Sequence, residues 1–440
     1  MLTEQENVDL TRVGPGTPAG ELLRRYWYPV AATIELTSNP VKPVRLLGED
    51  LALFRDRSGR LGLVADRCAH RLVALSYGMV EPNGLRCMYH GWVFDSDGNC
   101  IEQPNEAPGS RFKEACSITA YPVEELGGLI WAYLGPEPAP LLPRWDLFVE
   151  EGRYVRQITE CTIPCNWLQI MENSVDPVHT EWAHGNYAHY VLAQMGLIPE
   201  PKGRSPHHSR IGFDEFEYGI IKRRVYEGRT EEHPDWAVGH PLVFPDMLRN
   251  HHYFQIRVPV DDTHTWHIWY HSTLAPEDVE VPDQSAGVPM VRFDYLDDNG
   301  RVRVDNVNGQ DIAAWLTQGD ITDRTEEKLG STDLGIQMFR KMLKREIANV
   351  ARGEDPIGII RDPTKNECIL LPDQDVFIWQ SQGKMDSQED LKKEGVELRN
   401  IAGVSRNFSP DGWKAEESVA KVLEKIGNDR VIGRVVGPQY

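Results

Sequence analysis

Two short segments that each pair a cysteine with a histidine constrain this chain more than any other feature of its sequence. The first segment runs from Cys68 to His70, and the second, sixteen residues later, runs from Cys87 to His90. Thiolate and imidazole side chains at such short spacings are typical metal ligands. Short β-like runs border both segments, so we expect two tight loops that together supply two thiolates and two imidazoles.

Two kinds of metal centre use this ligand set. Two Cys and two His hold structural zinc in many small domains. They also hold one kind of [2Fe–2S] cluster, the Rieske centre, in which two His replace two Cys on one iron and raise the potential. The spacing favours the cluster, because Cys-x-His followed by Cys-x-x-His is unusual for zinc fingers. Gly78, Gly84 and Gly91 offer turns through which backbone N–H groups can reach the sulfurs, whereas Cys100 and Cys116 do not fit the spacing and are interpreted as small apolar residues.

A second group of metal-ligand residues lies near the middle of the chain. Two His and one carboxylate can hold Fe(II) and leave open positions for O2 and substrate. His179 and His184 lie five residues apart, which is about 140° around an ideal helix. They can therefore share one ion only if the helix ends or bends between them. Gly185 and Asn186, directly after His184, predict such an end.

Asp176 has two interpretations. It lies three residues before His179, so on a helix it can share the face of His179, accept that ring's second N–H and fix its tautomer. Alternatively, Pro177 is a good first helical residue, which makes Asp176 an ordinary N-cap. The residues alone leave both interpretations open.

The third iron ligand has to come from a distant part of the sequence. Asp311 is the first choice, because it precedes an apolar and aromatic helical start, where a buried carboxylate needs a partner such as a metal. Asp320 and Asp323 are the alternatives, although solvated turn positions explain them more simply. Arg204, Arg249, His189 and Trp236 are candidates for the substrate pocket.

The 440 residues suit two domains, and the expected fold class is α+β. Residues 1–40 are expected to form a helical segment that packs on the catalytic domain. Short β-like runs over residues 41–140 predict a small all-β domain that carries the cluster. The Pro-rich segment near its end marks a boundary. Residues 141–440 are expected to form a larger catalytic domain of antiparallel sheet and helices that holds the mononuclear iron.

Local patterns predict individual elements in both parts. A helix is expected near Gly20–Trp27, and strands are expected at Tyr253–Val258 and Thr265–Tyr270. A longer helix is expected over Asp333–Arg352, capped by Thr332 or Asp333. Another helix is expected near Glu416–Ile426.

Composition excludes some classes of function. The net charge is −20, from 47 basic and 67 acidic side chains, which argues against a nucleic-acid partner. The sequence has no signal-peptide pattern and no apolar stretch near the roughly 20 residues that span a bilayer. Seven cysteines without a secretion signal indicate reduced thiols. We therefore expect a cytoplasmic protein with no membrane partner.

The two motifs together resemble a known family. Cys-x-His-x16-Cys-x-x-His followed by Asp-x-x-His-x4-His is similar to the oxygenase α subunits of Rieske non-haem iron oxygenases. The resemblance covers nearly the whole chain, including Leu10–Pro18, Arg24–Trp27 and residues 310–333. These outer blocks resemble the phthalate-dioxygenase-type branch, with its dehydrodivanillate O-demethylase-like and carboxydiphenyl-ether dioxygenase-like members.

The resemblance implies a role for each motif residue. Two residue pairs would each hold one iron of the [2Fe–2S] cluster: Cys68 with Cys87, and His70 with His90. Three residues would hold the mononuclear Fe(II): His179, His184 and Asp311. Asp176 would carry electrons from the cluster of a neighbouring subunit to this iron, which implies a homotrimer or hexamer. Some members have Asn where this chain has Glu172, and the effect of that difference is open.

The implied function is that of a terminal oxygenase, an enzyme of the EC 1.14 class. It would use O2 to hydroxylate or oxidatively demethylate a small aromatic substrate that bears a carboxylate or an ether. Electrons would come from NADH only indirectly, through a separate reductase and in some systems a ferredoxin. The alternative is a Rieske electron-transfer protein without oxygenase activity, which would hardly need the 300 residues from 141 to 440. A zinc-stabilised binding protein is the third hypothesis.

Overall fold

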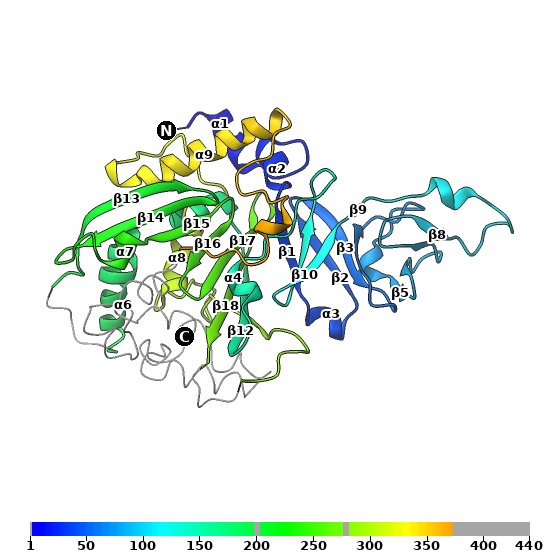
Figure 1. The fold of residues 1–440 in the computed structure, drawn as a ribbon, viewed down its shortest axis with the longest axis horizontal. Coiled ribbons are helices and arrows are strands. Elements are labelled where there is room, and N and C mark those ends of the chain that lie inside the picture. Colours follow the sequence, from blue (N-terminus) through cyan, green and yellow to red (C-terminus); the bar gives the residue numbers. More distant parts are fainter. Residues whose placement is uncertain (1, 198–202, 276–280, 373–440) are drawn as a thin grey trace.

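The computed structural model describes residues 2–197, 203–275 and 281–372 (Figure 1). A large body is built on an eight-stranded sheet, and smaller sheets extend from one side of it. Helices and largely antiparallel sheets are both present, which confirms the α+β class. Within the described ranges, no helix combines the length and apolarity needed to cross a bilayer.

The N-terminal segment contains two short helices and then joins a sheet. Thr3 and Glu6 form a capping box at α1 (Glu4–Thr11), and Thr17 caps α2 (Pro18–Leu23). The helix expected over Gly20–Trp27 therefore ends earlier than predicted. Trp27 instead begins the buried strand β1 (Trp27–Ala32), which pairs with β11 (Leu129–Tyr133). Aromatic residues and a proline in this stretch favour extended backbone over helix.

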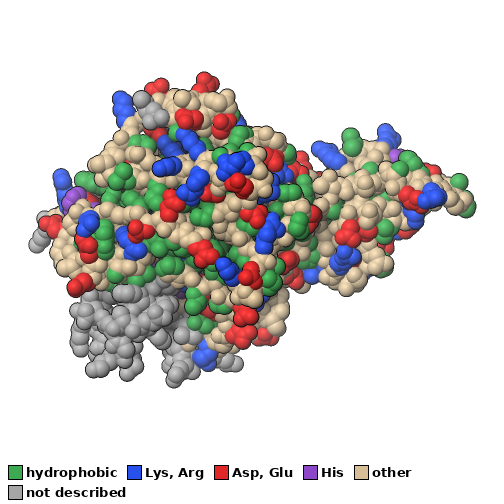
Figure 2. All heavy atoms as spheres, turned by 45° about the horizontal axis from the view of Figure 1, so that its top comes forward, with side chains coloured by type: hydrophobic (Ala, Val, Ile, Leu, Met, Phe, Trp, Pro, Cys, Tyr) green, Lys and Arg blue, Asp and Glu red, His purple; other side chains and the backbone are tan. Residues whose placement is uncertain are grey.

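Three small sheets make up most of the first part of the chain. One has the order β1-β11-β10, with β10 at Val123–Leu126. Another contains β2 (Val41–Leu46), β3 (Glu49–Arg55), β4 (Leu61–Ala65) and β9 (Ala120–Tyr121). The last contains β5 (Met79–Glu81), β6 (Gly84–Arg86), β7 (Val93–Phe94) and β8 (Cys100–Glu102). We call this last sheet and its loops the tip, because it projects from the body (Figure 2).

The body sheet has the strand order β13-β14-β15-β16-β17-β18-β12-β19. Its strands are β12 (Tyr154–Ile163), β13 (His208–Phe216), β14 (Gly219–Tyr226), β15 (His240–Val243), β16 (Met247–Asn250), β17 (Tyr253–Asp261), β18 (His264–Leu274) and β19 (Met290–Arg292). Only the β12–β19 pair is parallel among these described strands. The two strands predicted from the sequence are β17 and β18.

Alternate residues of the body sheet face two different layers. On one face, Phe254 and Tyr270 pack around Phe148 of the one-turn helix α4 (Asp146–Val149), and the Phe148 ring also meets Trp131 of β11. The opposite face carries Trp269, which shares a core cluster with residues of α5 (Trp167–Ser174) and α8 (Val307–Thr317). We call this second surface the site face.

The body also carries α6 (Ala188–Gln194), α7 (Pro234–Ala237), α9 (Leu334–Ala351) and a π-helix at Thr180–Tyr187. The one-turn helix α3 (Glu35–Ser38) instead lies beside the small sheets, where it contacts β1 (Figure 1). The prediction of a long helix near Asp333–Arg352 is confirmed by α9, although the Asp333 side chain bonds the backbone N–H of Gly330 and does not cap α9. The helix expected near Glu416–Ile426 lies outside the described residues.

Candidate metal centres

The two Cys–His loops of the tip are built in the same way. In the first loop, the N–H of Cys68 donates to the carbonyl of Val73, and the N–H of Leu72 donates to the carbonyl of Cys68. In the second loop, Cys87 bonds Trp92 and Gly91 in the same pattern. The fifth residue of each loop is left-handed, with φ of 61° at Leu72 and 75° at Gly91. Each loop thus turns back tightly and presents its cysteine and histidine on one side.

The four side chains of these loops meet in the tip, where they line one small pocket. The Cys68 and Cys87 side chains are buried, and the rings of His70 and His90 lie 4.5 Å apart. His70 also stacks on Trp92 at 4.7 Å, which fixes its orientation. Burial raises the pKa of the Cys68 thiol to about 11, although backbone N–H groups that bond its sulfur act in the opposite direction.

The geometry of the tip fits a two-iron cluster better than a single zinc ion. Four ligands of one tetrahedral zinc, at bonds of about 2.0 to 2.3 Å, would lie within about 4 Å of one another. In the described parts of the chain, the one group of three or more such ligand atoms that gathers within 4.8 Å is His179, His184 and Asp311. The tip ligands are spread more widely, as two separate irons require. Backbone N–H groups on the Cys68 sulfur are also a feature of iron–sulfur ligation.

A π-helix brings the two histidines of the second group together. His179 lies at its start, and His184 lies inside it. The helix end predicted at Gly185 and Asn186 is absent from this segment, because the π-helix runs directly into α6. In a π-helix the backbone bonds run from i to i+5, so side chains five residues apart come to lie on similar faces. The two rings accordingly lie 5.1 Å apart at 85°.

Asp311 reaches this pair from the first turns of α8. Its Oδ1 lies 3.2 Å from His184 Nε2 and 3.7 Å from His179 Nε2. Asn306 caps α8 through the N–H of Gly309, and a side chain at Gly309 would collide with the carbonyl of Arg303. The cap and this close approach together fix the start of α8 and therefore the position of Asp311.

A hydrogen bond sets the tautomer of His184. Its Nδ1 lies 2.9 Å from Gln310 Oε1, and the Gln310 amide donates to the carbonyl of Val304. Because the amide nitrogen is used there, Gln310 presents its oxygen, so His184 Nδ1 must carry the proton. Nε2 then keeps its lone pair toward Asp311. A neutral imidazole with a fixed free nitrogen is what a metal ion requires.

The electrostatics of the group indicate a site made for a cation. Burial raises the pKa of Asp311, but His184, His179 and Asn173 lower it more, to about 2. Burial lowers the pKa of His184, but Asp311 and Gln310 outweigh it and the net shift is upward. Without a cation, a carboxylate and two imidazoles would be enclosed together at a cost. The donor set of two imidazoles and one carboxylate fits a mononuclear non-haem iron.

Asp176 makes the N-cap contact and lies beside His179, whose Nδ1 has no hydrogen-bond partner among the described residues. Its Oδ1 accepts the N–H of Val178 at 2.8 Å, and its Oδ2 lies 3.5 Å from His179 Nδ1. Burial raises the pKa of the Asp176 carboxyl, but His179 and the Val178 N–H lower it more, so the net pKa is lowered. One oxygen therefore stabilises the turn before the π-helix, while the other faces the second nitrogen of His179.

Sequence reasoning missed two contributors to this site. Gln310 and Asn173 contact His184 and Asp311, with Asn173 Nδ2 at 3.3 Å from Asp311 Oδ1. The sequence signal for them was position alone, since Gln310 directly precedes Asp311 and Asn173 directly follows Glu172. Glu172 itself points to a different place, where it bonds Arg324 and Arg340 and ties α5 to α9. The residue that contacts an iron ligand is therefore Asn173.

The other candidate residues lie elsewhere. Asp320 and Asp323 are exposed, and Asp323 closes a turn with Thr325. The four pocket candidates do not converge on the ligand group. Arg204 stacks on the exposed Trp182 and Trp236 on Arg210, while His189 is exposed and Arg249 pairs with Asp146 on the opposite face of the sheet.

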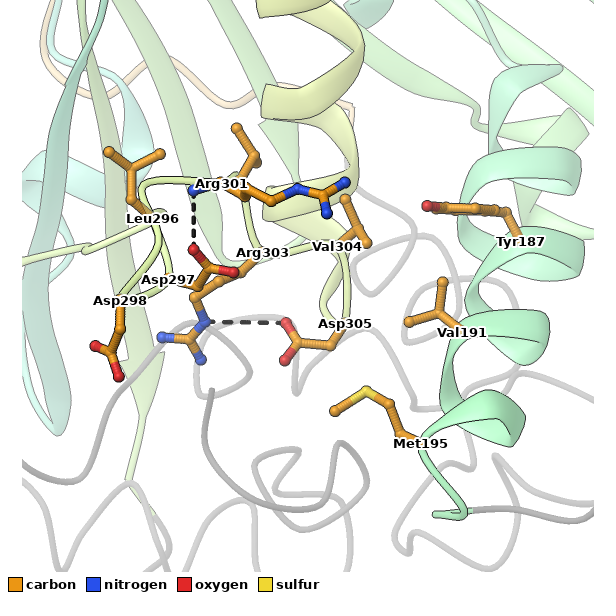
Figure 3. Close-up of a pocket in the computed structure, with 11 residues that line it drawn as sticks. Tyr187, Val191, Met195, Leu296, Asp297, Asp298, Arg301, Arg303, Val304 and Asp305 are labelled. Carbon is orange, nitrogen blue, oxygen red and sulfur yellow. Dashed lines mark hydrogen bonds and ion pairs between the residues drawn. The ribbon is translucent and has the colours of Figure 1, made fainter.

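A cavity of about 640 Å³ adjoins the segments that carry the ligands (Figure 3). One wall comes from the helical segment after His184, with Tyr187, Val191 and Met195 pointing toward the opposite loop. The other wall is residues 296–305, just before α8, and includes the Arg303–Asp305 pair. This size suits a small organic molecule.

Comparison with known proteins gives two family matches within this chain. Residues 26–122 match the family described as Rieske [2Fe-2S] domain, and residues 294–374 match LigXa C-terminal domain like. The 5,5'-dehydrodivanillate O-demethylase oxygenase subunit of Sphingobium sp. (strain NBRC 103272 / SYK-6) is 44% identical over 84% of this chain and 87% of its own length. The phthalate 4,5-dioxygenase oxygenase subunit of Pseudomonas putida is 35% identical over 81% and 89%.

Solved structures show the same fold. NdmA of Pseudomonas putida CBB5, solved with caffeine, superimposes with a TM-score of 0.55 at 21% identity, over 76% of this chain and 93% of that chain. The identity to the curated relatives over most of both lengths is what establishes the family. The chain therefore belongs to the oxygenase subunits of the Rieske non-haem iron oxygenases, enzymes that carry a Rieske [2Fe–2S] cluster and a mononuclear non-haem iron.

Proposed function

We propose that this oxygenase subunit hydroxylates or oxidatively demethylates a small aromatic substrate that bears a carboxylate or an ether, with His179, His184 and Asp311 as the ligands of the catalytic iron. The convergence of these three ligand atoms within 4.8 Å carries the proposal. At the tip, the proposed cluster ligands are Cys68, His70, Cys87 and His90. When bound, the ferrous iron supplies the reduction of O2 that the organic substrate cannot bring about itself.

The protein's own part is to hold these ligands in one arrangement. Gln310 keeps the proton on His184 Nδ1, so that Nε2 is free. Asn173 donates to Asp311 Oδ1 and limits the rotation of the carboxylate. These three residues would hold a bound ferrous iron and would leave it open positions for O2 and substrate. The cavity between α6 and residues 296–305 is the proposed route for the substrate (Figure 3).

We further propose that electrons reach this iron from the cluster of a neighbouring subunit through Asp176. Within one chain, the tip and the helices α6 and α8 lie on opposite sides of the molecule (Figure 1). The tip exposes large apolar side chains around its histidines, including Leu72, Met88 and Tyr89, which are 65%, 56% and 51% exposed. Such a surface suits contact with a second copy. Head-to-tail contacts of this kind close into a ring, and a homotrimer or hexamer is the proposed assembly.

The proposed electron source is NADH, through a separate reductase or a ferredoxin, because the sequence contains no Gly-rich dinucleotide-binding turn. A cytoplasmic location goes with this proposal. The proposed domains are residues 1–40, 41–140 and 141–440. Contacts of α1 and α2 with α9 support the packing of the first segment on the catalytic domain, and the β1–β11 pairing joins it to the second.

Product analysis under labelled O2 tests the proposed reaction. The purified protein, with a reductase and NADH, is supplied with methoxylated, phenoxylated and carboxylated aromatics. Incorporation of two labelled atoms identifies dihydroxylation. Release of formaldehyde identifies demethylation, and one labelled atom in the organic product without formaldehyde identifies monohydroxylation. Substrate-independent NADH consumption without any labelled product would refute the oxygenase proposal.

A further inference from the structure

The site face of the body sheet carries buried polar groups without hydrogen-bond partners. Gln157, Thr159 and His267 are each at most 1% exposed. Within the described residues, the Gln157 amide, the Thr159 hydroxyl and both His267 ring nitrogens have no partner. Thr159 pairs across the sheet with Trp269, and His267 pairs with Arg257. Because side chains alternate along a strand, these residues share one face.

This face lies beside the iron ligands. The His267 ring is 5.5 Å from the ring of Trp315, and Trp315 lies one helical turn after Asp311 on α8. Trp269 and Trp315 belong to the same core cluster. Buried polar groups in native proteins are almost always satisfied by protein, water or ligand. The layer between the sheet and α8 is therefore suited to a polar occupant with aromatic surface around it.

Lys222 adds a positive charge to the same face. Residues that pair directly across neighbouring strands point to the same face of a sheet. A series of such pairs runs from β18 to β14 along the site face: Trp269, Gln255, Leu248, Leu242 and Ile220. Lys222 follows Ile220 by two residues and therefore shares this face. It is 7% exposed, and in the part of the chain that the structure describes its ammonium has no hydrogen bond and no carboxylate within 4.0 Å. Buried lysines are otherwise paired.

The charges around the iron site leave a positive excess. Burial lowers the pKa of Lys222 to about 7, although Asp176 and Asp311 act to raise it. The two negative charges of these carboxylates would neutralise the charge of a ferrous iron and would leave none for Lys222. Arg257, which is 0% exposed on the same face, also has no carboxylate within 4.0 Å among the described residues. Asp246 does not pair with either cation, since among the described residues it lies more than 4.0 Å from both, and burial raises its pKa to about 8 although Arg257 acts to lower it.

We propose that Lys222 is a specificity-determining residue that binds a carboxylate of the aromatic substrate through its ammonium group. The inference rests on the proposed oxygenase function and deepens it, because it assigns recognition of the acid to one side chain. Arg257 has a supporting role, since both its Nη groups already donate to Gln255. It contributes a fixed positive charge, while the Lys222 ammonium is free to bond the ligand.

Calorimetric titration of the anaerobic holoenzyme, with its cluster oxidised, tests this assignment without turnover. The probes are 5,5'-dehydrodivanillate, phthalate and phenoxybenzoate, each beside its methyl ester. Wild type is expected to prefer at least one acid over its ester. In Lys222→Met the Kd for that acid is expected to rise about 10- to 100-fold, the effect of one charge-assisted hydrogen bond. The Kd of the ester should change less than about threefold, and Lys222→Arg should keep part of the acid preference.

Two controls distinguish failure of the Lys222 assignment from failure of the proposed oxygenase function. Lys341→Met removes an exposed lysine of α9 and should leave every Kd unchanged. Cluster absorption, iron content and labelled-O2 incorporation are measured on the same preparations, and a wild type that incorporates no label fails as an oxygenase whatever its Kd values. If Lys222→Met loses its cluster, Lys222→Gln provides the neutral side chain instead. The proposal is overturned if no acid binds wild type better than its ester, or if the neutral variant keeps the acid preference.

Discussion

Replacement of Glu172 by Gln should destabilise the body severely, because Glu172 neutralises two buried arginines. Glu172 is 5% exposed and Arg324 is 0% exposed. Glu172 Oε2 lies 2.7 Å from Arg324 Nη2, and Glu172 Oε1 lies 2.6 Å from Arg340 Nε. In Glu172→Gln, Arg340 keeps its bidentate partner Glu327. Among the described residues, Arg324 keeps only neutral partners, namely Asn7 Oδ1 and the carbonyl of Thr322. The variant therefore leaves one buried guanidinium without a counter-charge.

The magnitude follows from that uncompensated charge. Removal of one partner from a buried ion pair typically costs about 3 to 5 kcal/mol. At about 2 to 4 °C per kcal/mol for a domain of 150–250 residues, the unfolding midpoint should fall by about 6 to 20 °C. Differential scanning calorimetry at one scan rate measures this shift. Glu354→Gln, which removes an exposed partner of Arg352, is the matched control and should leave the midpoint unchanged.

Acid titration and a double variant test the physical reason. Burial raises the pKa of Glu172, but Arg324 and Arg340 outweigh it, so its folded pKa lies below the ordinary value of a glutamate. A lowered carboxyl pKa stabilises the fold above the unfolded value, and this contribution is lost as the pH falls through the folded value. The midpoints of wild type and Glu172→Gln should therefore converge below about pH 4.5. Adding Arg324→Met to Glu172→Gln should recover stability. A double variant less stable than Glu172→Gln, or a midpoint fall no larger than that of Glu354→Gln, would refute the reasoning.

Three further predictions concern the metal centres. Asp176→Asn should retain both metals yet lose coupled turnover, measured as substrate-dependent O2 uptake. The control Asp323→Asn, at an exposed turn, should have normal turnover. Normal turnover in Asp176→Asn would leave Asp176 with only its turn-stabilising role. Gln310→Leu should weaken iron binding about 10- to 100-fold by releasing the His184 ring, as measured by competition with an iron chelator. An unchanged affinity would contradict the role of Gln310 in setting the His184 tautomer. Mild chelation should abolish O2 uptake and leave the visible absorption of the cluster intact. Added Fe(II) should then restore O2 uptake. Simultaneous loss of O2 uptake and cluster absorption would argue against two independent centres.

Sequence spacing was sufficient for the residues that act within one loop. The Cys68–His70 and Cys87–His90 loops are local structures, each closed by hydrogen bonds within six residues. Their pattern could therefore be recognised in the sequence. The strands β17 and β18 were also predicted, because their runs of apolar, aromatic and β-branched residues favour strands, and so was the helix α9, whose buried residues follow a helical period.

Long-range features were less accessible to sequence reasoning. A π-helix has no simple sequence signature, so the prediction that the helix would end at Gly185 was wrong although His179 and His184 do meet. The helix expected to reach Trp27 ends at Leu23, and Trp27 instead begins β1, whose pairing partner β11 lies about a hundred residues away and was not used in the prediction. The partners of Glu172 could not be found either, since Arg324 and Arg340 are more than 150 residues distant.

Metal and sulfide analysis of the Asp311→Ala variant tests the central claim most directly. The account predicts that wild type holds the two irons and two acid-labile sulfides of the cluster plus one further iron per chain. Asp311→Ala should lose that further iron alone and keep the electron paramagnetic resonance signal of the reduced cluster. A variant that retained the third iron, or a fully loaded wild type without acid-labile sulfide, would contradict the account.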